Sequence, residues 1–279
     1  MPPYAELQVT SNFSFLRGAS HPEELVMAAA ALGHSAIAIT DRNTLAGVVR
    51  AHVAAKEAGI RLVVGARLCL AGDLSFICLP TGRAAYGRLA ALLTLGKRRA
   101  EKGQCRLTLD DLLDGEEFAG GTGQILLAIA PETGAERDFG EVLNKLRDRV
   151  KNNLYFIVNK TYKGDDKQRI LALAELARAC RTPLVAANDV NAHSAARRPL
   201  QDVLTCIREH CAIFEAGYRL HANAERHLKA PDEMARLFAD WPDAVARTAD
   251  IATMCDFSLD ELRYEYPVDP VPPGNTPQE

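Results

Sequence analysis

Short apolar runs rich in β-branched residues alternate with longer segments rich in alanine and leucine along most of the chain. The runs are apolar throughout, as is typical of strands that are covered on both faces. The expected strands are residues 7–9, 35–40, 61–64, 75–79, 125–129, 154–158 and 184–186. The expected helices between them are residues 20–32, 44–59, 84–95, 139–150 and 166–179. This order predicts an α/β fold, with a distorted (β/α)7 barrel as the leading architecture and an open doubly wound sheet as the alternative.

The pattern changes after Asn188, where helices are expected at residues 200–210, 232–237 and from Trp241 or Pro242 to residue 254. Residues 264–279 contain five prolines, which exclude a helix, and few apolar side chains that could enter a core. We therefore expect three parts. They are a β/α barrel over residues 1–195, a short helical C-terminal extension over 196–262 that closes the domain, and a Pro-rich linker over 263–279.

Composition and charge narrow the possible roles. A formal net charge of -3 argues against a generally basic nucleic-acid-binding protein, so DNA contact would need a local patch. Lys97, Arg98 and Arg99 are the best candidates, although cations at a helix end also complement the helix dipole. The seven cysteines include no CxxC pair, which indicates reduced core residues and no zinc site. Because there is no apolar stretch of membrane-spanning length, we expect a cytoplasmic protein without membrane contact.

Polar residues follow several of the expected strands, at the end of a β/α barrel where functional residues gather. They are Gln8, Thr10 and Ser11 at the end of the first strand, Asp41, Arg42 and Asn43 at the end of the second, Arg67 near the end of the third, and Asn188, Asp189 and Asn191 at the end of the last. Zinc and manganese sites are built mainly from histidine and carboxylate ligands. Only Asp41 and Asp189 in this set are carboxylates, and none is histidine, so the residue types do not favour a metal enzyme.

Several segments of the chain resemble sequence motifs of a known domain family. Residues 7–18 resemble a motif that begins His-x-His-Ser and ends Leu-Leu-Asp-Gly, and residues 38–48 resemble Thr-Asp-His-Gly-x-Leu-x-Gly. Residues 64–67 are similar to Ile-Gly-x-Glu, and residues 184–191 to Val-Ala-Thr-Asn-Asp-Val-His. These are motifs of the N-terminal PHP (polymerase and histidinol phosphatase) domain of bacterial C-family DNA polymerases. Residues 197–208 are similar to a segment found in the error-prone, damage-inducible branch of that family. The resemblance covers the whole chain in order and implies the PHP fold.

The chain departs from these motifs at the positions that the resemblance assigns to metal ligands. Those positions are Gln8, Thr10, Arg17, Arg42, Arg67, Asp189 and Asn191, and only Asp189 retains a liganding carboxylate. Because arginine does not lose its proton in proteins, it cannot serve as a ligand. We therefore predict no metal and no catalytic residue here. We also predict an ion-pair network of Asp41, Arg42, Arg67 and Asp189 at the barrel mouth.

The resemblance implies a structural and interaction module that is not itself an enzyme, within a parent translesion DNA polymerase that acts in DNA repair. Its partners would be the polymerase core of the same polypeptide, DNA bound by the parent, the sliding clamp and a Y-family-like accessory protein. No cofactor is expected in this domain, and Mg²⁺ is expected in the polymerase core. Two alternatives remain. One is an active metal-dependent phosphoesterase or 3′–5′ exonuclease, and the other is a phosphate- or anion-binding barrel that uses Arg42 and Arg67.

Overall fold

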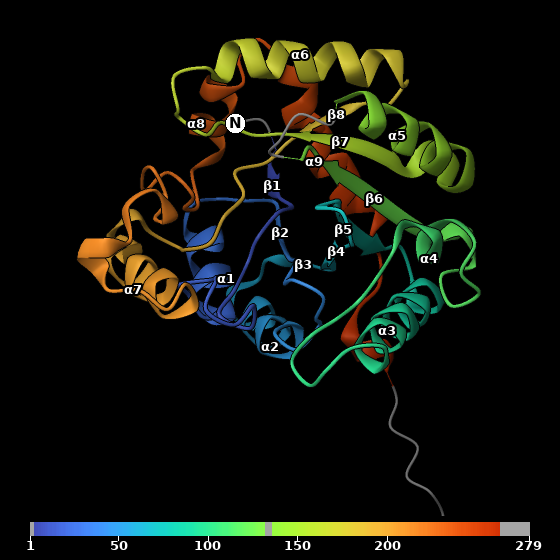
Figure 1. Cartoon of the computed structure of the whole chain (residues 1–279), viewed down its shortest axis with the longest axis horizontal. Coiled ribbons are helices and arrows are strands. Elements are labelled where there is room, and N and C mark those ends of the chain that lie inside the picture. Colours follow the sequence, from blue (N-terminus) through green and yellow to red (C-terminus); the bar gives the residue numbers. More distant parts are fainter. Residues whose placement is uncertain (1–2, 132–135, 263–279) are drawn as a thin grey trace, which may run out of the picture.

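The computed structural model describes residues 3–131 and 136–262, and its strands form two neighbouring sheets with helices outside them (Figure 1). The first sheet is parallel and has the order β1-β2-β3, with β1 at Ala5–Glu6, β2 at Ala36–Ile39 and β3 at Arg61–Val64. The second sheet has the order β4-β5-β6-β7-β8. Its strands are β4 at Ala66–Cys69, β5 at Ser75–Pro80, β6 at Gln124–Ile129, β7 at Leu154–Val158 and β8 at Leu184–Ala186. β4, β5 and β6 pair antiparallel, whereas β6, β7 and β8 pair parallel.

Single bridges connect the two sheets at both of their junctions. Val9, just beyond β1, forms a parallel bridge with Val190, just beyond β8. At the other junction Arg42, beyond β2, forms a parallel bridge with Arg67 in β4. The α/β fold is therefore confirmed, but the strands are not the uniformly parallel set that a regular β/α barrel requires.

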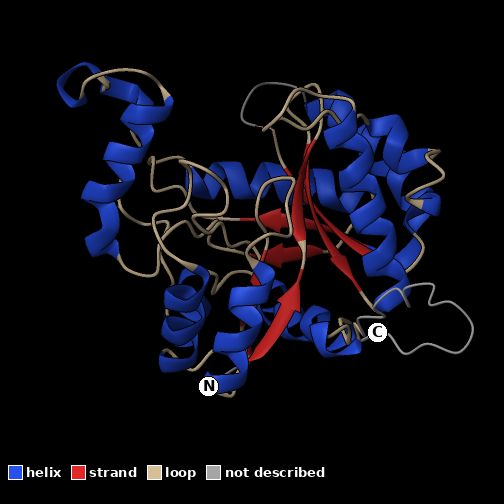
Figure 2. Cartoon of the chain, turned by 90° about the horizontal axis from the view of Figure 1, so that it is seen from below, coloured by secondary structure: helices blue, strands red, loops and turns tan. Residues whose placement is uncertain are grey.

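Helices cover the outside of both sheets, as Figure 1 shows, and Figure 2 shows the strands inside the shell of helices. The helices that accompany the strands are α1 at Pro22–Ala31, α2 at Val48–Ala58, α3 at Arg83–Arg98, α4 at Leu109–Leu113, α5 at Glu136–Val150 and α6 at Asp166–Ala179. Short 3-10 helices lie at Ala119–Gly121, Lys151–Asn153, Ala195–Arg197, Ile213–Glu215, Gly217–Arg219 and Leu259–Glu261.

The strands are buried on both faces, which accounts for their continuously apolar sequences. All six residues of β5 and all four of β2 are buried. One core cluster lies between the sheets and includes Leu7, Val63, Ile77, Leu127 and Val185. Two further clusters lie beneath the helices, one under α1 and α2 and the other under α3, α5 and α6. This double covering fixes the strand ends that carry the candidate site.

The helices expected after Asn188 are present as α7 at Arg198–Arg208, α8 at Pro231–Leu237 and α9 at Pro242–Met254. Helix α9 packs against β8 and β1, where Ala5 N donates a 3.0 Å hydrogen bond to Thr248 Oγ1. Helix α7 lies at the left edge of Figure 1, away from the sheets. None of the helices in the described ranges has the length and apolar character that spanning a bilayer requires. The expected linker at 263–279 lies outside the described residues.

Four local expectations differ from the structure. The first strand lies at Ala5–Glu6, not at residues 7–9, which follow it and join it to Val190. Strand β4 was not expected. The second helix begins at Val48, four residues later than expected, because residues 41–47 form the turn that leads from β2. Helix α1 begins at Pro22, two residues later than expected, because Pro22 occupies the first helical position. His21 is its N-cap, and Glu24 completes the capping box.

Candidate functional site

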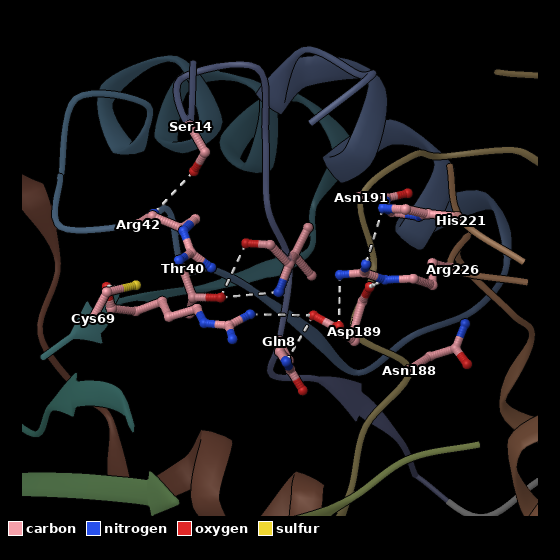
Figure 3. Close-up of polar contacts among 12 residues, drawn as sticks. Gln8, Ser14, Thr40, Arg42, Cys69, Asn188, Asp189, Asn191, His221 and Arg226 are labelled. Atoms are coloured by element: carbon pink, nitrogen blue, oxygen red, sulfur yellow. Dashed lines mark hydrogen bonds and ion pairs between the residues drawn. The ribbon is translucent and has the colours of Figure 1, made fainter. Parts of the chain in front are cut away.

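The two junctions between the sheets bring together polar residues that are far apart in the sequence. The bridge between Val9 and Val190 places Gln8 beside Asp189, and the bridge between Arg42 and Arg67 brings those two arginines together. The first bridge is fixed by hydrogen bonds from Val190 N to Gln8 O, at 2.9 Å, and from Thr10 N to Val190 O, at 2.8 Å. Figure 3 shows the resulting group of polar side chains around Asp189.

Asp189 lies at the centre of the site, and several donors surround its carboxylate. Gln8 Nε2 donates to Oδ1 at 2.7 Å, and Arg67 Nη1 lies 3.6 Å from the same oxygen. Arg226 Nη2 lies 2.6 Å from Oδ2, while Arg226 Nε donates to the backbone carbonyl of Asp189 at 2.9 Å. Burial would raise the pKa of Asp189, but the charges of Arg226 and Arg67 outweigh that effect and hold the pKa below its usual value. Asp189 is therefore an ionised counterion to two guanidinium groups.

Asp41 differs from the expected arrangement, because its partners are serines and not arginines. Ser11 donates to it from both N and Oγ, at 2.8 and 2.7 Å, and Ser14 Oγ donates at 2.6 Å. Within residues 3–131 and 136–262, no arginine lies within ion-pair distance of Asp41. The segment after β1 folds back over the end of β2 and places these hydroxyl groups, and not a guanidinium group, against the Asp41 carboxylate. Burial raises the pKa of Asp41, and the serine hydrogen bonds counter part of that increase.

Arg42 also departs from the expected network. Its backbone N donates to Ser14 Oγ at 2.9 Å, but its guanidinium has no carboxylate within ion-pair distance among the residues that the structure describes. Burial lowers the pKa of Arg42, and the charges of Arg67 and Arg226 lower it further, although Asp189 has the opposite effect. The expected four-residue network is thus reduced to the pair of Arg67 and Asp189, and Arg226 joins it.

The other positions assigned to former ligands lie around this group without contacting the Asp189 carboxylate. Thr10 is buried and belongs to the junction with Val190. Asn191 Nδ2 lies 3.3 Å from His221 Nδ1, and Asn191 N donates to Arg226 O at 3.0 Å. Arg17 is exposed at the end of the segment that follows β1; burial lowers its pKa, and so do the nearby charges of Arg42 and Arg208.

Three site residues were not found from the sequence. Arg226 and His221 come from the segment between the 3-10 helix Gly217–Arg219 and α8. A bridge between Ala192 and His227 holds that segment beside the site. Burial and the charge of Arg226 lower the pKa of His221 to about 4. Glu6 is fully buried behind Gln8, where it accepts hydrogen bonds from Tyr4 Oη at 2.7 Å and Gln8 N at 3.0 Å. Burial raises the pKa of Glu6 to about 7.

The donor set does not fit the metal centre that the motif resemblance implies. Within the described ranges, no three or more histidine, cysteine, aspartate or glutamate side chains are grouped so that they could hold a metal ion. Gln8 and Arg67 stand at former ligand positions, and their donors point at Asp189, whose two oxygens are thereby engaged. A divalent cation at this position would face guanidinium groups that cannot be deprotonated.

The predicted DNA-contact residues lie away from this group, at the C-terminal end of α3. Lys97, Arg98 and Arg99 are all exposed. Arg99 Nη1 lies 2.7 Å from Asp111 Oδ1, so that guanidinium already has an acidic partner. DNA contact by this run stays a prediction.

Comparison with known proteins gives one family and several relatives. The profile of the PHP domain family matches residues 6–161. An error-prone DNA polymerase of Caulobacter vibrioides is 51% identical over 276 residues, which are 99% of this chain and 25% of that protein. An error-prone DNA polymerase of Bradyrhizobium diazoefficiens is 48% identical over 99% of this chain and 24% of its own length. This chain therefore spans about a quarter of the length of these relatives.

Among solved structures, an amidohydrolase from Chromobacterium violaceum, with bound sulfate and no metal, superposes with a TM-score of 0.50. The match covers 68% of this chain and 88% of that protein at 17% sequence identity. At this level the similarity concerns the fold alone, and it agrees with the α/β architecture described above.

Proposed function

This chain belongs to the PHP domain family, and we propose that it acts as a structural and interaction module, without a catalytic metal centre, in a longer error-prone DNA polymerase. The longer protein would synthesise DNA across damaged templates during repair. Its nucleotidyl transfer, with Mg²⁺, would take place in a separate polymerase core. In this proposal the module's partners are that core and, through the parent, DNA, the sliding clamp and a Y-family-like accessory protein.

One observation carries the proposal that this domain is catalytically silent. Asp189, the carboxylate retained among the former ligand positions, is bound by Gln8, Arg67 and Arg226. To bind a metal ion, Asp189 would have to give up these contacts and leave Arg67 and Arg226 without a counterion. Among the described residues, no group of further ligands is close enough to complete the coordination of the metal. Arranged in this way, the residues can hold strand ends together, but they cannot activate a water molecule or polarise a phosphate through a metal ion.

The architecture supports a distorted β/α barrel as the scaffold of this module. The single bridges at Val9–Val190 and Arg42–Arg67 join the sheets at both junctions, and the ion pairs of Asp189 reinforce the first of them. In this proposal residues 1–195 form the barrel, the helices of residues 196–262 close it through α9, and the following residues lead toward the polymerase core.

The metal content and nuclease activity of the purified chain test this proposal. The chain is incubated with Zn²⁺ or Mn²⁺, desalted and analysed by inductively coupled plasma mass spectrometry, and single-stranded DNA is offered as an exonuclease substrate. We expect far less than one metal ion per chain and no DNA cleavage that EDTA abolishes. Stoichiometric metal together with EDTA-sensitive cleavage would instead establish the metal-dependent phosphoesterase or exonuclease.

The role within a polymerase is tested separately with the longer polypeptide. We expect the full-length protein to extend a primer in the presence of Mg²⁺ and the 279-residue chain alone to incorporate no nucleotide. A full-length protein that is folded but extends no primer would refute the polymerase assignment.

A further inference from the structure

More arginines than carboxylates surround the barrel mouth. Four of them form what we call the arginine cluster, namely Arg17, Arg42, Arg67 and Arg226, each of which is electrostatically coupled to at least one other. The acidic groups that face the cluster are Asp189 and Asp41. Asp189 is shared between Arg67 and Arg226, and the acceptor oxygens of Asp41 are already bound by Ser11 and Ser14. The local charge is therefore strongly positive, even though the chain as a whole carries a net charge of -3.

This excess of positive charge destabilises the folded state unless a nearby negative charge compensates for it. Arginine stays protonated at all physiological pH values, so the cluster cannot relieve the repulsion by losing protons. Partial burial weakens solvent screening, and the lowered pKa values of Arg42 and Arg17 reflect both burial and the neighbouring guanidinium groups. An anion placed between the guanidinium groups would offset the repulsion and supply the acceptors that they lack.

Individual donors are also available for such an anion. Arg67 Nε is buried and has no hydrogen-bond partner, and the Arg42 guanidinium has no carboxylate partner in the part of the chain that the structure describes. Side-chain exposures of 16% for Arg67 and 34% for Arg226 leave the cluster reachable from solvent. Guanidinium groups bind the oxygens of phosphate in pairs, with a geometry that a lysine ammonium does not offer.

We propose that the arginine cluster binds a phosphate group directly, without a metal ion. Arg42 and Arg67 contact the phosphate oxygens, and Arg226 contributes charge from the opposite side of Asp189. Asp189 is a positioning residue here, because it fixes Arg67 and Arg226 and does not contact the anion. The ligand is a free phosphate ion or a terminal phosphate monoester. The proposal goes beyond the module's role in a polymerase and does not depend on it.

The first test measures binding of inorganic phosphate to the 279-residue chain. Thermal unfolding is followed while phosphate replaces chloride at constant ionic strength, with EDTA present throughout. We expect the melting temperature to rise and to saturate with phosphate, because a ligand that binds only the folded state stabilises it. No difference between phosphate and chloride, or a rise that occurs only in a parallel titration without EDTA, would overturn the proposal.

Arg42→Gln is the informative variant. We expect it to weaken phosphate binding by about tenfold or more, since it removes one charge-assisted contact. In phosphate-free buffer its melting temperature should not fall, because the wild-type guanidinium has no carboxylate partner and is repelled by its neighbours. Arg98→Gln makes the same chemical change on exposed α3, outside the cluster, and should bind phosphate like the wild type. If both variants weaken binding equally, the effect is one of overall charge and the site does not exist.

A second measurement distinguishes the two sources of the phosphate group. Isothermal titration calorimetry with inorganic phosphate and with deoxyadenosine 5′-monophosphate gives two dissociation constants. Tighter binding of the free ion supports the proposal and identifies phosphate itself as the ligand. Tighter binding of the nucleotide, lost in Arg42→Gln, supports it and identifies a monoester. Binding of the nucleotide that Arg42→Gln leaves intact would contradict the assignment to this cluster.

Discussion

A guanidinium can replace the charge of a metal ion at a protein site, but not its coordination chemistry. Arg67 stands at a position that the motif resemblance assigns to a metal ligand, and it lies 3.6 Å from Asp189, the carboxylate that the motif would give to a metal. Arg226 completes the replacement from another segment of the chain. An ion pair of this kind holds strand ends together, but it provides neither a Lewis acid nor a metal-bound hydroxide. This difference is the reason why the function proposed for the domain is a structural one.

Replacing Asp189 with Asn tests how much this pair stabilises the fold. The change keeps the side-chain shape but removes the charge, which leaves Arg67 and Arg226 without a counterion in a partly buried site. We expect the free energy of unfolding to fall by about 2–4 kcal/mol in urea denaturation, since breaking such a pair leaves uncompensated charge. Asp260→Asn is the matched control, because Asp260 is 60% exposed and solvent screens its pair with Lys56, so this change should have little effect on stability. Equal effects of the two changes would refute the role of Asp189.

Glu6 gives the fold a specific pH dependence. Burial raises its pKa to about 7, whereas an unfolded chain would release the same proton near 4.5. Between these values the folded state holds more protons, so this contribution to stability is complete below pH 4.5 and is lost as the pH rises through 7. The shift corresponds to about 3 kcal/mol. Wild type should therefore lose about this much stability relative to Glu6→Gln between acidic and mildly alkaline buffer.

Urea unfolding at a series of pH values measures this difference. Glu175→Gln removes one negative charge from the exposed surface and serves as the control for net charge. Its stability should follow that of wild type with pH. A Glu6→Gln curve parallel to wild type would show that the Glu6 proton is not retained on folding.

Part of the candidate site could be predicted from the sequence, and the residues that could not be predicted depend on tertiary structure. Gln8, Arg67 and Asp189 could be placed because each follows or begins a strand, and the ends of barrel strands converge. Arg226 could not be placed, because it lies in an irregular segment whose position depends on a tertiary bridge at Ala192–His227. Asp41 was expected to pair with arginines because of its charge, but the hydroxyl groups of Ser11 and Ser14 bind its carboxylate instead.

At the scale of elements, prediction succeeded where an apolar run ended in clear turn signals. Strands β3, β7 and β8 and helix α6 have the bounds that were expected. Strand β4 was missed because its four residues alternate between buried and partly exposed positions and follow β3 after the single residue Gly65. A strand this short is defined by its antiparallel pairing with β5 and not by local propensity.

The turn that follows β1 has no room for a side chain at Gly18. A Cβ atom at this position would lie 2.2 Å from Ser11 O and 2.6 Å from Thr10 O, both of them backbone atoms. We expect Gly18→Ala to lower the free energy of unfolding by about 2–3 kcal/mol, because the turn must open to remove the clash. Gly87→Ala is the control: Gly87 lies within α3, with no atom within 4 Å of its Cβ position. That change should raise stability by about 0.5–1 kcal/mol. Chemical denaturation distinguishes the opposite signs.

At the scale of the whole molecule, the apolar surface is unevenly distributed. Leu200, Val203 and Ile207 are spaced along one face of α7 and remain 40–53% exposed, and Phe214 just beyond them is 85% exposed. Figure 2 shows this helical part at the edge of the molecule, apart from the sheets. The main cores, in contrast, contain phenylalanines that are almost fully buried, such as Phe238. The apolar side chains of α7 therefore contribute little to the stability of the domain itself.

Phe214→Asp tests this separation between surface and core. Because the ring is 85% exposed, the substitution should change the free energy of unfolding by less than about 0.5 kcal/mol. It should also reduce binding of the dye ANS, because an exposed apolar surface becomes charged. Phe238→Ala is the matched core change, and we expect it to cost about 3–5 kcal/mol because that ring is 1% exposed. A loss of stability in Phe214→Asp comparable to that of Phe238→Ala would mean that the Phe214 ring is packed within the domain.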